Sequence, residues 1–392
     1  MLRSFQLANH KSIRDEQDFI LLPAYDKSKP AVSVAAVFGA NASGKSTLLD
    51  GLHWMRRAVL ESFSVWEPGL GVPRTPFRLE LDAARPSSYV IELQLDDVRY
   101  LYGFEVDDER VRQEWLYTYP HNRRRVVFER EGNSIRLGST VADARSREET
   151  LAGLTRDNAL LLSVAAHSNQ RETLPVYQWL RRGVRVADQR RGTVIAGIRD
   201  RINAGGALQK STLALIRSAD LGICDVQTDA YAEPPKLWFV HHGGSTPLEF
   251  DEESAGTQTW LAMLSVAFGV LEQGGLLIVD ELDRSLHPHL SASLVNLFRD
   301  PHSNPLRAQL LFTTHDTTLL DEDTLGRDEI WFVEKDPDSG ATRLFPLTDF
   351  HPRKNENTER RYLAGSYGAV PVVSEVDMRD AMSRYRQAHD AA

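Results

Sequence analysis

The sequence has almost no cysteine and no long apolar run. Its single cysteine, Cys224, cannot form a disulfide within the chain, which excludes a disulfide-stabilised secreted domain. No stretch approaches the roughly eighteen apolar residues that a membrane-spanning helix needs, so we expect no membrane span. Residues 1–15 carry charges where a signal peptide requires an apolar segment. We therefore expect a cytoplasmic protein.

Lysine and net positive charge are also scarce. Only eight of the 46 basic residues are lysine, and 55 acidic residues give a formal net charge of −9. This charge excludes a surface that attracts nucleic acid everywhere, although a local basic patch is compatible with it. Solvated arginines are the default interpretation, and contact with DNA stays open. The candidate arginines are Arg123, Arg124, Arg125, Arg181, Arg182, Arg185, Arg190 and Arg191.

The order of strand and helix patterns predicts an α/β protein. With 392 residues, 42% of them apolar, the chain has room for two or three globular units. Short apolar runs predict strands at 4–7, 19–22 and 33–38, and a helix follows the third. Two-residue periodicity over 77–131 predicts an antiparallel sheet, and the later alternation of strands and helices predicts a parallel one. The predicted divisions are an N-terminal lobe (1–144), a helical arm or lid (145–235), a C-terminal lobe (236–373) and a tail (374–392).

A glycine-rich loop follows the third strand. The run from Gly39 to Ser46 fits G-x-x-x-x-G-K-[ST] and lies between a predicted strand and a predicted helix, the context of a phosphate-binding Walker A loop. Lys45 would reach the β- and γ-phosphates, and the Ser46 hydroxyl would bind Mg²⁺. An ordinary glycine-rich turn is the alternative. The predicted nucleotide-binding residues are Gly39, Ala40, Asn41, Ala42, Ser43, Gly44, Lys45, Ser46 and Thr47.

Two adjacent carboxylates follow an apolar strand at 276–279. In a P-loop enzyme the first acid, Asp280, would hold Mg²⁺, and the second, Glu281, would act as the general base for the attacking water. Acidic pairs at strand ends are otherwise usually solvated. A later strand, 310–314, precedes His315, whose imidazole could donate to a phosphate oxygen if the two strands are neighbours. A structural histidine is the alternative.

Further motifs give the chain a family resemblance. Residues 254–258, at the start of an apolar helix, resemble the signature loop of ABC-type ATPases, and residues 282–288 resemble their D-loop. His315 resembles their switch histidine. The resemblance implies that Ser254 and Gly256 bind the γ-phosphate of a nucleotide held by a second subunit; a plain serine N-cap is the alternative. It also implies an ABC-type head, with an antiparallel β subdomain, a RecA-like parallel-sheet lobe and an inserted helical arm.

More narrowly, the chain resembles SMC, RecF and OLD-type ATPases, and among them bacterial ATPases of the abortive-infection and RloA type. The run from Asn9 to Ile13 resembles the N-F-[RK]-S-[FI] opening of RecF-like ATPases, with His10 in place of the usual aromatic residue. Where the Q-loop glutamine is expected, the chain has His167, followed by Asn169 and Gln170, and no nuclease motif follows residue 350. The resemblance implies ATP and Mg²⁺ as cofactors, a homo-oligomer of at least two subunits, a separately encoded nuclease-like effector, and a phage protein as trigger.

Three functions agree with these motifs. The first is a slow ATPase of anti-phage defence that controls its effector through nucleotide-dependent self-association. The second is a RecF- or SMC-like ATPase that binds DNA in repair, which salt-sensitive DNA binding would support. The third is a scaffold that binds ATP and hardly hydrolyses it. Replacing Glu281 with Gln separates the first from the third, because only the first predicts a trapped, associated state. We favour the first.

Overall fold

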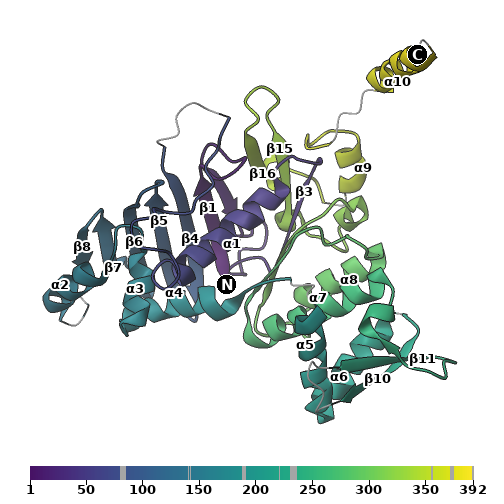
Figure 1. Cartoon of the computed structure of the whole chain (residues 1–392), viewed down its shortest axis with the longest axis horizontal. Coiled ribbons are helices and arrows are strands. Elements are labelled where there is room, and N and C mark those ends of the chain that lie inside the picture. Colours follow the sequence, from purple (N-terminus) through teal and green to yellow (C-terminus); the bar gives the residue numbers. More distant parts are fainter. Residues whose placement is uncertain are drawn as a thin grey trace.

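The computed structural model describes residues 1–392 except 80–84, 140, 142, 188–190, 220, 230–235, 355, 371–374 and 391–392. The described chain is a mixed α/β protein with three sheets (Figure 1). Arg190 and the predicted boundary between residues 373 and 374 lie outside the described residues. The predicted fold class, with an antiparallel and a parallel sheet, is confirmed.

The first sheet is antiparallel and has seven strands in the order β2-β1-β4-β5-β6-β7-β8. Along β4, the side chains of Tyr89, Ile91 and Leu93 are buried while their neighbours are more exposed, as expected for a sheet with one face on a core. The predicted two-residue periodicity therefore marks a real antiparallel sheet. Its strands are β1 (Leu2–Ala8), β2 (Gln17–Ile20), β4 (Ser87–Leu95), β5 (Val98–Val106), β6 (Val111–Tyr119), β7 (Arg125–Glu131) and β8 (Ser134–Leu137).

The second sheet has six strands in the order β16-β15-β3-β14-β13-β9. All neighbours are parallel except the β15–β16 hairpin. The predicted adjacency of the strands at 276–279 and 310–314 is confirmed, since β13 pairs with β14. The strands are β3 (Val34–Gly39), β9 (Val184–Val186), β13 (Leu276–Val279), β14 (Gln309–Thr313), β15 (Ile330–Lys335) and β16 (Thr342–Pro346).

Two hydrophobic cores lie on the two faces of this second sheet. Successive β3 side chains point to opposite faces, so Ala35 and Val37 belong to one core, while Ala36 and Phe38 belong to the other. The first core also takes the buried faces of the antiparallel sheet and of α1 (Lys45–Glu61). The second takes the apolar α7 (Ala255–Gln273) and α8 (Pro288–Arg299). The strand that leads into the glycine-rich loop is therefore packed on both faces.

The interval 145–235 differs from the single helical arm that we predicted. Its α3 is buried in the first core, α2 and α4 contribute only a few side chains to that core, and β9 then joins the parallel sheet beside β13. The later part, with α5 and α6, packs into the second core together with a small sheet, β10-β11-β12 (Figure 1). The elements are α2 (Ala144–Leu154), α3 (Leu161–His167), α4 (Leu174–Gln178), α5 (Arg191–Asn203), α6 (Gly206–Ser218), β10 (Ile223–Asp229), β11 (Lys236–His241) and β12 (Leu248–Glu249).

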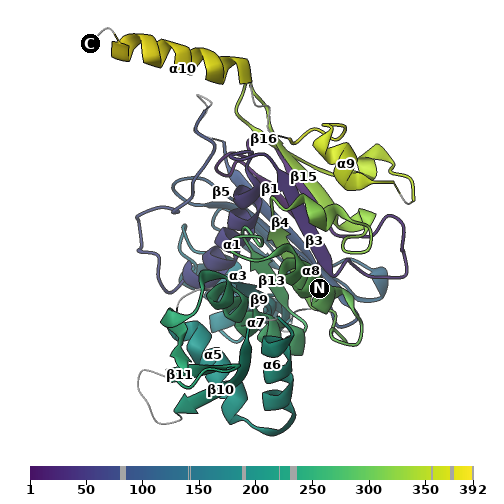
Figure 2. The same cartoon turned by 90° about the vertical axis from the view of Figure 1, so that its right-hand side faces the viewer.

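The C-terminal part contains α9 (Thr358–Leu363) and α10 (Glu375–Asp390), which extends away from the rest of the chain in both views (Figures 1 and 2). Within the predicted tail (374–392), the chain is helical from Glu375 to Asp390. Among the described residues, none of the helices has both the length and the apolar character needed to cross a membrane. Single turns are η1 (Pro120–Asn122), η2 (Arg171–Thr173), η3 (Trp179–Gly183), η4 (Phe250–Glu252), η5 (Thr317–Leu320), η6 (Arg327–Glu329) and η7 (Leu347–Phe350).

Candidate functional site: a phosphate-binding loop and two carboxylates

The glycine-rich loop connects β3 to α1, and both terminal glycines are required by their surroundings. A Cβ atom on Gly39 would collide with the Val333 carbonyl oxygen of β15. Gly44 has φ of 106°, in a region that favours glycine, and a Cβ atom there would collide with the Thr342 hydroxyl. The loop therefore packs closely against the β15–β16 hairpin. Helix α1 starts at the residue after Gly44, and no side chain caps its N-terminus.

Lys45 lies inside this loop. Its side chain is only 6% exposed, and its Nζ donates to the carbonyl oxygens of Gly39 at 2.8 Å and Ala40 at 2.9 Å. Burial lowers the pKa of Lys45, while the carboxylates of Asp280 and Glu281 oppose that shift. A buried, positively charged group beside two acids is well placed to neutralise an entering anion.

A cavity of about 410 Å³ opens over the loop, large enough for a phosphate tail. The Ser43 Oγ is buried and has no hydrogen-bond partner in the described structure. Its hydroxyl can therefore donate a hydrogen bond to a ligand. The walls combine loop residues with one carboxylate and the predicted histidine. The cavity is lined by Ser12, Asn41, Ala42, Ser43, Gly44, Lys45, Ser46, Thr47, Glu281 and His315.

The two predicted acids lie at the end of β13, on the same edge of the sheet as the loop. The Ser46 Oγ donates to Asp280 Oδ1 at 3.0 Å, so the two predicted metal ligands are in contact. Thr313, the last residue of the intervening strand β14, donates to the same oxygen at 2.6 Å and accepts the Glu281 N–H at 2.7 Å. Glu281 itself has a left-handed φ of 53°, a conformation that a functional turn can impose on a non-glycine residue.

These oxygens fit a hard divalent cation. Hydroxyl and carboxylate oxygens are the ligands that Mg²⁺ takes in P-loop proteins, with the remaining positions filled by phosphate oxygens and water. In the part of the chain that the structure describes, no group of three or more His, Cys, Asp or Glu residues could hold a metal by itself. The Ser46–Asp280 pair is therefore suited to a metal that arrives with a phosphate.

The backbone at His315 is held by the carboxylate of Asp283. Asp283 accepts the Thr314 hydroxyl at 2.7 Å and the His315 backbone N–H at 3.1 Å, which fixes the chain where it leaves β14. The loop after His315 is fixed in turn because Thr317 donates to Glu359 of α9 at 3.0 Å. The imidazole therefore has a fixed backbone and a free ring at the cavity wall.

Ser254 and Gly256 do not line this cavity. The Ser254 hydroxyl accepts the Thr257 backbone N–H at 3.1 Å and so caps α7. A Cβ atom on Gly256 would come within 3.0 Å of the Ser285 carbonyl oxygen, in the segment predicted to be a D-loop. Gly256 therefore lies beside the D-loop segment of its own chain, and neither Ser254 nor Gly256 lines the cavity over the glycine-rich loop.

Several other predicted positions lie elsewhere. His167 bonds to the Ser163 carbonyl oxygen at 2.8 Å, Gln170 is buried against Arg147 and Glu172, and neither they nor Asn169 line the cavity. The Q-loop role therefore stays unassigned.

Thr313 and Thr342 were not predicted. Thr313 ends the buried strand β14, and Thr342 begins the half-exposed strand β16. A threonine at a strand end is visible in the sequence, but its partner cannot be inferred before the strand order is known.

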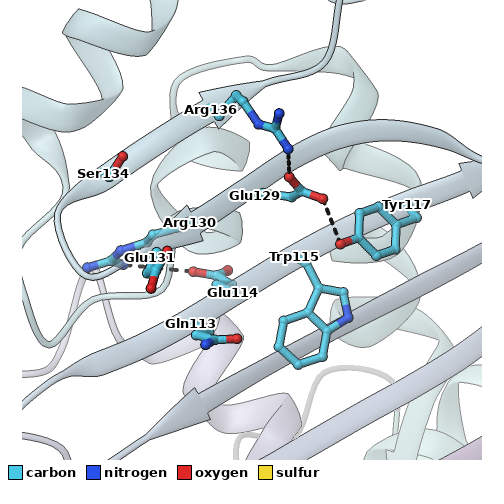
Figure 3. A pocket seen from close by; sticks show the side chains of 9 residues that line it. All are labelled: Gln113, Glu114, Trp115, Tyr117, Glu129, Arg130, Glu131, Ser134 and Arg136. Carbon is cyan, nitrogen blue, oxygen red and sulfur yellow. Dashed lines mark hydrogen bonds and ion pairs between the residues drawn. The ribbon is translucent and has the colours of Figure 1, made fainter.

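A second cavity, of about 360 Å³, lies on the antiparallel sheet (Figure 3). None of its lining residues is shared with the cavity over the loop. Glu129 accepts the Tyr117 hydroxyl at 2.8 Å and pairs with Arg136, while Glu114 and Arg130 lie 3.8 Å apart (Figure 3). Because these charges satisfy one another, we interpret this cavity as structural.

Burial raises the pKa of Glu114, although Arg130 and hydrogen bonds oppose the shift. Glu114 accepts the Leu161 N–H at 2.5 Å and the Leu162 N–H at 2.8 Å, so it holds the start of α3. Arg130 reaches the Ala159 carbonyl oxygen at 2.5 Å. The pair therefore fixes the helical segment after residue 145 to the antiparallel sheet.

The fold and the first cavity define a class of protein. A glycine-rich loop between a parallel strand and a helix, with two carboxylates on the same sheet edge, is the arrangement of an ABC-like P-loop ATPase. The family described as "AAA domain, putative AbiEii toxin, Type IV TA system" matches residues 34–321, and the chain belongs to this family.

The chain is also similar to solved structures at low identity. The SmcHead bound to the C-winged helix domain of ScpA is 13% identical, with 89% of this chain and 99% of that chain covered and a TM-score of 0.44. The Smc head domain bound to the C-terminal domain of ScpA, derived from Pyrococcus furiosus, is 13% identical, with 89% and 97% covered and a TM-score of 0.44. CbiO1 from Clostridium perfringens, part of the ABC transporter complex cbiONQ, is 10% identical, with 93% and 95% covered and a TM-score of 0.34. No curated protein matches the chain.

Proposed function

We propose that this protein binds and hydrolyses ATP, and that nucleotide-dependent self-association lets it control a separately encoded, nuclease-like effector in anti-phage defence. The observation that carries the proposal is the position of the predicted residues. Lys45, Ser46, Glu281 and His315 line one cavity and Asp280 contacts Ser46, whereas the predicted signature residues do not line that cavity. Membership of a family named for an abortive-infection toxin supports the defence role. A cytoplasmic location and a phage protein as trigger belong to the same proposal.

Each side chain then has a role in the proposed reaction. The loop N–H groups and Lys45 bind the phosphates, and Ser46 and Asp280 hold Mg²⁺, which neutralises charge on the phosphate oxygens when bound. Glu281, held by Thr313 through its backbone N–H, orients and deprotonates the attacking water. His315 donates a hydrogen bond to the terminal phosphate. General-base catalysis of this kind contributes roughly 10²- to 10⁴-fold to the rate.

The signature loop explains why one subunit would be a poor enzyme. Ser254 and Gly256 are at the N-terminus of α7, a place that favours anions, but within one chain they do not line the cavity. We propose that they complete the site of a second subunit. Turnover per subunit should then rise with protein concentration across the dimerisation range, and a constant turnover there would count against the proposal.

The decisive experiment is the mass of Glu281→Gln protein, by light scattering or sedimentation, with and without ATP and Mg²⁺. A mass that grows with ATP supports nucleotide-driven association. The matched control is Glu281→Gln with Lys45→Ala added, which should stay at the nucleotide-free mass. If ATP binds and the mass of Glu281→Gln does not change, the self-association proposal is wrong.

A second candidate is a RecF- or SMC-like ATPase that binds DNA. The observation that favours it is the turn between β6 and β7, where Arg123, Arg124 and Arg125 are exposed. Arg124 stacks over the Tyr117 ring at 3.9 Å and donates to Glu129 at 3.3 Å, so a phosphate would compete with Glu129 for its N–H groups. Salt-sensitive binding of duplex DNA that is lost when all three arginines become glutamate would support this candidate, and no binding at low salt would remove it.

A further inference from the structure

Thr342 lies behind the phosphate-binding loop although it is almost at the other end of the chain. It is the first residue of β16 and is only 3% exposed. Its backbone N–H donates to the Ser12 carbonyl oxygen at 2.7 Å, and its Oγ1 lies 2.8 Å from both the Ser12 Oγ and the Ser43 carbonyl oxygen. Thr342 therefore joins three segments that are far apart in the sequence.

The three hydroxyls form an ordered chain. The Ser12 Oγ lies 2.9 Å from the Thr47 Oγ1, so the contacts run from Thr47 through Ser12 and Thr342 to the carbonyl of Ser43. A carbonyl oxygen can only accept, and a hydroxyl has one proton. Thr342 must therefore donate to Ser43, and the remaining protons can each point one step along the chain. No hydroxyl of the series is left without a partner.

This series of hydroxyl groups fixes the orientation of the peptide group between Ser43 and Gly44. In a trans peptide the C=O and the following N–H point in opposite directions. Because Thr342 holds the Ser43 carbonyl, the Gly44 N–H of the same peptide group points away from Thr342, and Gly44 lines the cavity. The position of Thr342 also explains why residue 44 has no Cβ atom.

Ser12 is itself held in a strained turn. Asn9 and Lys11 have left-handed φ values of 51° and 49°, and neither is glycine. The Asn9 side chain accepts the Phe77 N–H at 2.9 Å, and the buried His10 ring lies 2.8 Å from both the Tyr89 hydroxyl and the Asp50 carboxylate. The turn that carries Ser12 is therefore held by three side-chain hydrogen bonds.

We propose that Thr342 is a positioning residue for the phosphate-binding loop, which sets the Gly44 N–H for the nucleotide by holding the Ser43 carbonyl and the Ser12 hydroxyl. The inference rests on the proposed function, because it presumes that the loop binds a nucleotide. Ser12 and Thr342 both lie outside residues 34–321, the range that the family matches. The β15–β16 hairpin thus becomes part of the nucleotide site.

The test compares nucleotide binding by Thr342→Val, which has the same shape without the hydroxyl, with Thr342→Ser, which keeps it. The matched control is Thr173→Val, since Thr173 is 1% exposed and donates to the Gln170 carbonyl oxygen at 2.7 Å, in a segment that does not line the cavity. ATP affinity is measured by calorimetry, and the thermal unfolding midpoint without nucleotide is measured for each protein.

We expect Thr342→Val to weaken ATP binding about fivefold to tenfold, as the loss of an aligned hydrogen bond does, while Thr342→Ser and Thr173→Val stay within about twofold of the wild type. A purely structural role would lower the unfolding midpoints of both valine variants and leave ATP affinity unchanged, which would overturn the inference. Equal affinity losses in Thr342→Val and Thr342→Ser would overturn it too.

If Thr342→Val does not fold, Thr342→Ala removes the same hydroxyl with a smaller side chain, and the same weakening is expected because the bond to the Ser43 carbonyl is lost. Unchanged affinity in that variant would then contradict the inference. Wild-type protein that binds no ATP would overturn the proposed function and this inference with it, whereas wild-type binding with an unaffected Thr342→Val would overturn the inference alone.

Discussion

Replacing Thr313 with valine tests how the two carboxylates are held. Thr313 is fully buried, and its hydroxyl both donates to Asp280 at 2.6 Å and accepts the Glu281 N–H at 2.7 Å. Valine keeps the shape and removes both bonds. Thr313 reaches both residues because its strand, β14, lies between β3 and β13. Among the described side chains, Thr313 alone makes both contacts.

The expected magnitude follows from the two lost bonds. A hydrogen bond to a charged group contributes about 1.5–3 kcal/mol, and a buried N–H left without an acceptor costs about 1–3 kcal/mol. Asp280 and Glu281 are exposed, so water can replace part of each bond, and we expect a net loss of roughly 2 kcal/mol. If that energy holds Glu281 in its left-handed conformation for the reaction, kcat falls about 30-fold.

The assay measures ATP hydrolysis and thermal unfolding for Thr313→Val and for Thr313→Ser, which retains the hydroxyl. Thr313→Ser should keep a kcat within about threefold of the wild type, and Thr313→Val should show the loss mainly in kcat, because the phosphate-binding loop is unchanged. A Thr313→Val protein with the kcat and unfolding midpoint of Thr313→Ser would refute the reasoning.

Three further variants test other contacts. Lys45→Ala should abolish ATP binding in calorimetry; an affinity within about threefold of the wild type would contradict the proposed site. Glu114→Ala leaves the Arg130 charge buried and should lower the free energy of unfolding by about 3–5 kcal/mol, whereas adding Arg130→Met should recover part of the loss in denaturant titrations; a further loss would contradict the pairing. Burial alone would raise the pKa of Asp50, but its bonds from His10 and Lys11 prevail and lower it to about 2. A depressed carboxyl pKa stabilises the folded state above the unfolded value of about 3.9, and this stability is lost as the pH falls toward 2, so the stability gap between wild type and Asp50→Asn should narrow between pH 4 and 2; a gap independent of pH would contradict this.

The parts of the site that the sequence predicts are those encoded locally. The loop from Gly39 to Ser46 is recognisable because strand, loop and helix are contiguous, and the structure has β3 and α1 on either side of it. The acids after β13 are recognisable because an apolar strand precedes them. The structure brings Asp280 into contact with Ser46 and places Glu281 at the cavity.

The parts that the sequence does not predict depend on pairing between distant segments. Thr342 contacts the loop only because β15 pairs with β3, and no periodicity reveals that pairing. β9 has three residues, too few to show a two-residue period, so the helical arm or lid predicted for 145–235 does not include it. The apolar run of α3 was correctly interpreted as helical, but its burial in the first core depends on Glu114, which lies on a strand.

The central position of β3 has a consequence for the synthesis of the chain. β3 ends at residue 39, yet its two neighbours begin only at residues 309 and 330. The antiparallel sheet is complete by residue 137 and can form during translation. Both edges of the apolar β3 stay unpaired until β14 and β15 have been synthesised. An exposed apolar strand of this kind is prone to aggregate, so we expect the nascent protein to depend on chaperones. An unfinished chain contains the glycine-rich loop but has no place to hold a nucleotide.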